Sequence, residues 1–74
     1  MAKAFVLINI KSGFEEEIIK KLNQMKISKF HPIYGKYDFI ITIDSSTIDK
    51  VKTNIFEIRK MPNVISTLTM MAIE

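Results

Sequence analysis

Asp38 is a carboxylate placed between turn-forming residues and an apolar strand, because the sequence YGKYD over residues 34–38 runs directly into Phe39-Ile40-Ile41. Either this carboxylate only ends a hairpin in solvent, or it binds a ligand. Strand alternation predicts that several hydroxyl side chains share its sheet face, beside an apolar surface. Polar groups in such a place pair with one another or hold a ligand. The set comprises Asp38, Thr42, Thr67 and Thr69, with Ser66 next to them.

The chain offers little for catalysis or metal binding. His31 is the only histidine and the only candidate general base, and no nucleophile with a partner can be identified near it. Cysteine is absent, which excludes disulfides and leaves a structural zinc site without its usual ligands. We therefore predict a protein that is not an enzyme and that needs no metal or cofactor.

Two other classes of protein share the fold predicted below. A small dimeric αβ-barrel enzyme would have to use Asn9, His31 and the tyrosines, whose spacing shows no catalytic pattern. It stays open as an alternative. An RNA-recognition domain carries a basic-Gly-aromatic-Gly-aromatic strand signature, which this sequence lacks. We therefore predict no direct nucleic-acid binding.

Length and composition favour a single domain over residues 1–74 that associates with itself. Ordering so short a chain costs about 1.5 kcal/mol per residue, which nearly cancels the hydrophobic gain. Small domains add disulfides, metals or self-association to compensate, and 47% hydrophobic residues point to the last of these.

Charge and hydropathy indicate a cytoplasmic protein that does not enter a membrane. The net charge is +3, and the basic residues are scattered from Lys3 to Lys60, as on an ordinary solvated surface. The longest apolar run, Ala4 to Ile8, is too short to cross a bilayer. No stretch resembles a signal peptide.

Hydrophobic periodicity predicts four strands and two helices. Ser12 with Glu15 forms a capping box at the first helix, and Ser46 with Asp49 repeats that pattern at the second. The predicted elements are strand 4–10, helix 13–25, strand 28–34, strand 37–44, helix 48–60 and strand 64–73.

The order βαββαβ predicts the α+β class with a ferredoxin-like arrangement. Right-handed crossovers place both helices on one face of a four-stranded antiparallel sheet, in strand order 4-1-3-2. Pro32 agrees with an edge position for the second strand, because proline cannot donate to the ladder. Gly35-Lys36 fits a two-residue hairpin turn, which would pair Tyr34 with Tyr37 and Ile33 with Asp38.

Strand alternation also predicts which residues face the helices and which lie on the open face. The set under the helices is Val6, Ile8, Ile10, Phe30, Phe39, Ile41, Ile43, Val64, Leu68 and Met70. The open-face set is Phe5, Leu7, Asn9, Ile33, Asp38, Ile40, Thr42, Ile65, Thr67, Thr69, Met71 and Ile73. So apolar a face predicts dimerisation sheet to sheet.

The sequence resembles the effector-binding (RAM) domain of the Lrp/AsnC family, the leucine-responsive and asparagine regulators. Four segments carry the resemblance, which spans nearly the whole chain. They are the strand 4–10, the helix start GFEEE at 13–17, the turn YGKYD at 34–38, and RKMPNV at 59–64 with the hydroxyl run STLT at 66–69.

The resemblance implies a dimer built through the sheets, further assembly into rings, and a small-molecule site at the interface between dimers. The effector in this family is usually an amino acid, whose ammonium Asp38 would pair with. Amides near Gly35 and hydroxyls of the last strand would hold its carboxylate. The matching site residues here are Tyr34, Gly35, Tyr37, Asp38, Ser66, Thr67 and Thr69.

Full-length members of the family also carry an N-terminal helix-turn-helix domain, whereas this sequence enters the first strand at once. The resemblance is therefore to a stand-alone form, which would sense an amino acid or co-assemble with full-length Lrp/AsnC relatives. An ACT-like amino-acid-binding module has the same element order and ligand class, and stays open as an alternative.

Overall fold

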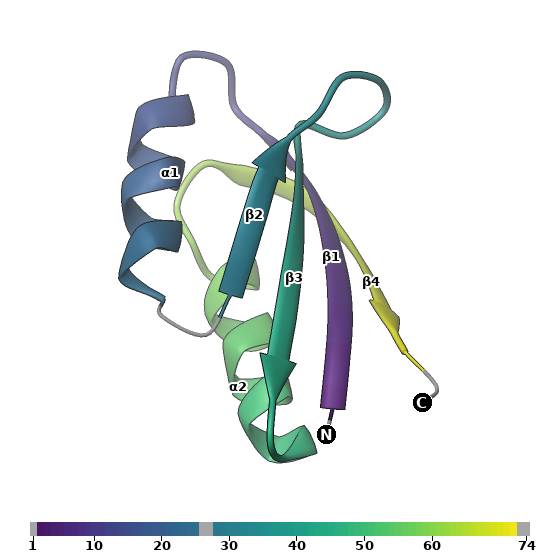
Figure 1. The fold of residues 1–74 in the computed structure, drawn as a ribbon. Helices are drawn as coiled ribbons and strands as arrows, with labels where there is room; N and C mark the ends of the chain where they lie inside the picture. Colours follow the sequence, from purple (N-terminus) through teal and green to yellow (C-terminus); the bar gives the residue numbers. More distant parts are fainter. Residues whose placement is uncertain (1, 26–27, 73–74) are drawn as a thin grey trace.

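The computed structural model describes residues 2–25 and 28–72. The described elements are β1 (Ala2–Ile10), α1 (Glu15–Gln24), β2 (Ser28–Pro32), β3 (Phe39–Ser45), α2 (Ile48–Arg59) and β4 (Val64–Met71) (Figure 1). The strands form one antiparallel sheet in the order β2-β3-β1-β4. This is the predicted order read from the other edge, so the ferredoxin-like fold is confirmed, with Pro32 in an edge strand.

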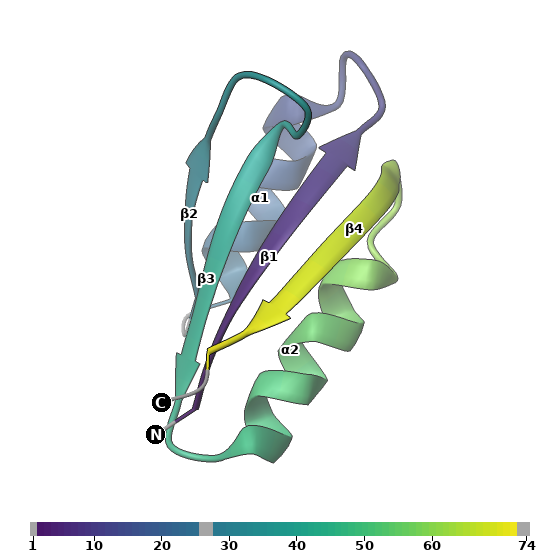
Figure 2. The same ribbon diagram turned by 90° about the vertical axis from the view of Figure 1, so that its right-hand side faces the viewer.

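Both helices cover one face of the sheet, and no described element covers the other face (Figures 1 and 2). The core lies between the helices and the covered face, because every second residue of the central strands points there. Its buried members are Ala4, Val6, Ile8, Ile10, Ile18, Leu22, Phe39, Ile41, Ile43, Val51, Ile58 and Met61.

The register of the first three strands agrees with the prediction. Phe30 lies opposite Ile41 on β3, and Ile41 lies opposite Val6 on β1. Directly opposed residues share a face of the sheet. The alternation in β1, β2 and β3 therefore assigned these side chains to the correct layer.

In β4 the predicted faces are wrong. Val64 pairs with Ile10 on the helix side, the face predicted for both, but Ser66 pairs with Asn9, so Ile65 is an extra residue in a β-bulge. One extra residue moves every later side chain to the opposite face. Thr67, Thr69 and Met71 therefore lie on the helix side, opposite Ile8, Val6 and Ala4. Leu68 and Met70 lie on the open face, opposite Leu7 and Phe5. Ile73, predicted for the open face and the strand end, lies outside the described residues.

The first helix begins later than predicted, and the Ser12–Glu15 capping box does not form. Phe14 is the N-cap residue and makes no side-chain cap. Its N–H donates to the carbonyl of Lys11 at 3.2 Å, and Gly13 has φ +92°. This is a tight turn that needs a positive φ at its third residue, which glycine supplies. The turn uses the residues that would have capped the helix.

Thr47, not Ser46, is the N-cap of α2. Its Oγ1 accepts a hydrogen bond from the Lys50 N–H at 3.3 Å. We expect Thr47→Ala to lower the free energy of unfolding by about 1 kcal/mol, since an orphan amide loses its partner. Chemical denaturation followed by circular dichroism measures the change. Ser46→Ala is the matched control and should leave the stability unchanged; equal losses in both variants would contradict the assignment.

In the part of the chain that the structure describes, neither helix has the length and apolar character needed to span a membrane.

Candidate functional site

Asp38 joins the end of β1 to the start of β3. Its N–H donates to the Ile8 carbonyl at 2.8 Å, and its Oδ2 accepts from the Ile10 N–H at 2.9 Å. The residue is nevertheless exposed. Its other carboxylate oxygen receives no hydrogen bond from the described residues. Asp38 therefore does more than end a hairpin in solvent, and it keeps one acceptor available to a ligand.

Asn9 and Ser66 continue this polar group along the same end of the sheet. The Asn9 Nδ2 donates to the Ser66 Oγ at 3.1 Å across the β1–β4 pair. Asn9 lies one residue beyond Ile8, which is opposite Phe39, so the register places Asn9 beside Asp38. The predicted site did not include Asn9. The sequence could have indicated Asn9 as a site residue, because Asn9 was predicted for the open face and the hairpin register put Asp38 on that face too.

The predicted two-residue hairpin is instead a longer loop. β2 ends at Pro32 and β3 begins at Phe39, although the Ile33 N–H still donates to the Asp38 carbonyl at 2.9 Å. The predicted pair of Ile33 with Asp38 is thus present, whereas Tyr34 and Tyr37 belong to no strand. Beyond Pro32 the Asp38 carbonyl keeps this one bond toward β2, while the N–H and the side chain of Asp38 both bond to β1.

The loop presents its two tyrosines differently. Tyr34 is 103% exposed, so its ring contacts almost nothing in a single chain, and Tyr37 is half-buried. Gly35 has φ +118°, a backbone conformation that side chains disfavour. The loop therefore extends from the sheet beside Asp38 and carries an aromatic ring with no partner.

Two of the predicted site residues do not join the others. Thr67 and Thr69 are half-buried on the helix side of the edge strand β4, whereas Asp38 and Ser66 are on the open side. The structure therefore brings together Asp38, Ser66 and the loop, and it separates the two threonines from them.

Within residues 2–25 and 28–72, no group of three or more His, Cys, Asp or Glu side chains is close enough to hold a metal ion. The polar end of the sheet carries one exposed carboxylate, one amide and one hydroxyl. Such a set can hydrogen-bond a small polar molecule, and the carboxylate favours a cationic group on it.

Comparison with solved structures places this architecture among known proteins. No protein-family model and no curated protein sequence matches the chain. Among solved structures, FFRP-DM1 superposes with a TM-score of 0.89 at 37% identity, covering 99% of this chain and 100% of that one. A hypothetical protein from Pyrococcus horikoshii superposes at 0.88 with 38% identity, covering 100% and 92%. Escherichia coli AsnC superposes at 0.84 with 21% identity, and the chain spans 51% of its length.

The fold and its open, partly polar face define a βαββαβ domain of the kind found in AsnC. The sequence identities of 37% to FFRP-DM1 and 38% to the Pyrococcus horikoshii protein extend over nearly the whole length of those two chains, so the similarity is more than a shared fold. The chain belongs to the Lrp/AsnC family, as the resemblance of its sequence predicted.

Proposed function

We propose that this chain is an amino-acid-sensing regulatory domain that self-associates through the open face of its sheet. It modulates transcription in the cytoplasm by co-assembly with full-length Lrp/AsnC relatives, without catalysis and without touching nucleic acid itself. Membership of the Lrp/AsnC family supports this, because a structurally similar protein from Agrobacterium tumefaciens is an AsnC family transcriptional regulator.

The observation that carries the proposal is the composition of the open face. Its centre is an apolar stripe of directly opposed residues from three strands, and its end near the 33–38 loop is polar. We call it the open-face stripe: Phe5, Leu7, Ile40, Leu68 and Met70. Leu68 and Met70 are 44% and 45% exposed, although both are large and apolar. A contiguous patch of this kind typically marks a protein interface.

A second copy that packs on the open-face stripe would bring its own 33–38 loop near the polar end of this face. There the two copies would form a niche for a small molecule. Rings of such dimers bring further copies to the same loop. The free oxygen of Asp38 then takes the ammonium of an amino acid, and the Ser66 hydroxyl and the amides at Gly35 take its carboxylate. Tyr34 and Tyr37 line the niche for the effector's side chain. Thr67 and Thr69, on the helix side of β4, lie outside this niche.

A thermal-shift screen against the twenty amino acids tests this. A ligand at a hundred times its Kd stabilises the fold by about 2.7 kcal/mol, and each kcal/mol raises the Tm by about 4–8 °C in a domain of this size. We expect such a rise with at least one amino acid, and we expect Asp38→Asn to reduce it. Asparagine keeps an acceptor for the Ile10 N–H, so the variant removes the charge and retains the sheet.

Asp44→Asn is the matched control. This carboxylate lies on β3 opposite Lys3, at the other end of the strand from Asp38, and pairs with Lys3 at 3.8 Å. It should leave the rise unchanged. A flat response to all twenty amino acids at millimolar concentration would refute the sensing function, and an undiminished rise in Asp38→Asn would remove Asp38 from the site.

A further inference from the structure

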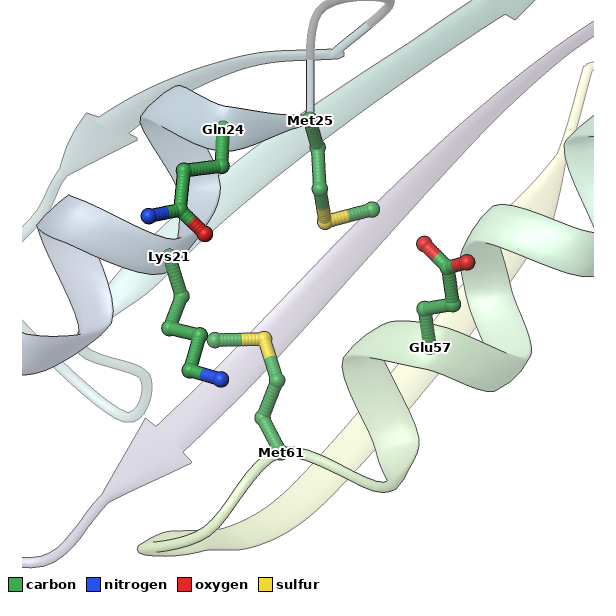
Figure 3. Close-up of a pocket in the computed structure, with 5 residues that line it drawn as sticks. All are labelled: Lys21, Gln24, Met25, Glu57 and Met61. Carbon is green, nitrogen blue, oxygen red and sulfur yellow. The ribbon is translucent and has the colours of Figure 1, made fainter.

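A groove of about 360 Å³ separates the two helices on the covered face of the sheet. Figure 3 shows the side chains that line it, with β1 behind them. Lys21 and Gln24 come from the C-terminal end of α1 and Met25 is its C-cap, whereas Glu57 comes from the last turns of α2 and Met61 from the turn that follows α2. The volume is at the lower end of the range for small-molecule sites, about 300–1,000 Å³. The groove has room for one small molecule.

The two walls carry opposite charges that do not neutralise each other. Lys21 and Glu57 are both exposed and both line the groove. In the described part of the chain the one ion pair within 4.0 Å is Lys3–Asp44, so the ammonium of Lys21 and the carboxylate of Glu57 stay apart. A simple anion in the groove would be repelled by Glu57, and a simple cation by Lys21. A molecule with both charges satisfies both walls.

Two methionines provide the apolar part of the lining. Met61 is 9% exposed and belongs to the core cluster, and Met25 is half-buried against it. Thioether side chains are flexible and polarizable, so they adapt to ligands of different shape. They favour an apolar substituent on the ligand, while the Gln24 amide adds a hydrogen-bonding group beside Lys21.

We propose that this groove is a binding site for a small zwitterion with an apolar chain, of which free apolar amino acids are the simplest members. Its carboxylate lies toward Lys21 and Gln24, its ammonium toward Glu57, and its apolar chain on Met25 and Met61. The proposal is independent of the proposed function, because the groove is on the opposite side of the sheet from Asp38 and shares no residue with that site.

Titration of the full chain, labelled with ¹³C at the methionine methyl groups and ¹⁵N at the amides, tests the groove by location. With L-leucine as the probe, we expect saturable shifts of the Met25 and Met61 methyl signals. N-acetyl-L-leucine lacks the ammonium and L-leucinamide lacks the carboxylate, so each should bind more weakly by about tenfold. Shifts of equal size with all three probes would overturn the charge argument. Shifts confined to the amides of residues 34–38 and Ser66 would overturn the groove while supporting the other site.

Charge variants give a second measurement. Lys21→Gln and Glu57→Gln should each weaken L-leucine binding at the groove by about three- to tenfold, as expected for exposed charged partners. Lys20→Gln is the matched control, a neighbouring exposed lysine that does not line the groove, and should bind as the parent does. The double variant Lys21→Glu with Glu57→Lys restores one charge of each sign in the groove. It should bind L-leucine more tightly than the variant with Lys21→Glu alone or the variant with Glu57→Lys alone. Unchanged affinity in both neutral variants would refute the proposal.

Discussion

Replacing Ile41 with alanine is expected to destabilise the fold by about 2–5 kcal/mol. Ile41 is fully buried in β3, between β2 and β1, with Phe30 opposite it on one side and Val6 on the other. The truncation removes apolar contacts and leaves a cavity that such a sheet centre closes poorly. A chain of this length has about 4–11 kcal/mol of total stability. We therefore expect a fall of Tm by about 8 °C or more, at about 4–8 °C per kcal/mol, measured by urea and thermal unfolding.

Ile40→Ala is the matched control for this prediction. It makes the same chemical change one residue earlier, on a half-buried side chain of the open face. Its loss should be smaller and should depend on protein concentration, because Ile40 belongs to the proposed contact with a second copy. The loss from Ile41→Ala should not depend on concentration. Equal losses in the two variants at every concentration would mean that the layers of the sheet are misassigned.

Much of the fold could be predicted because alternation and helical spacing are properties of the sequence itself. The run from Ala4 to Ile10 alternates between a buried and a half-buried side chain without interruption, so its face assignment needed no tertiary information. The helix starts were less predictable. Ser12 has the right side chain for a cap, but Gly13 makes a turn with Lys11 and Phe14 energetically easier at that point.

The candidate site was less predictable, because it depends on two backbone irregularities. The bulge at Ile65 moves Thr67 and Thr69 away from Asp38, and a bulge in an edge strand leaves no clear mark in a run such as VISTLT. The bond from the Ile10 N–H to the Asp38 carboxylate joins residues far apart in the chain, so no local pattern reports it. Both features lie where the ladder of the sheet ends, and ladder ends are set by tertiary contacts.

We expect the parent chain to self-associate and Leu7→Glu to be a folded monomer. Leu7 lies at the centre of the open-face stripe, with Ile40 opposite it on β3 and Leu68 opposite it on β4. In a single chain this side of the sheet is uncovered, so the new carboxylate reaches water and the fold is retained. In a sheet-to-sheet dimer the same charge would be buried without a partner, which costs several kcal/mol. Light scattering coupled to size exclusion measures the mass, and circular dichroism checks the fold.

Phe56→Glu is the control that separates this prediction from a general effect of removing exposed apolar surface. Phe56 is 61% exposed on α2, more than Leu68 or Met70 on the open-face stripe, and it lies away from the sheet face. If exposed apolar area alone drove association, this variant would dissociate at least as readily as Leu7→Glu. If association needs the opposed residues of three strands, Phe56→Glu keeps the parent mass and only Leu7→Glu becomes a monomer. A monomeric parent chain, or a Leu7→Glu variant that keeps the parent mass, would contradict the interface and with it the niche for the amino acid.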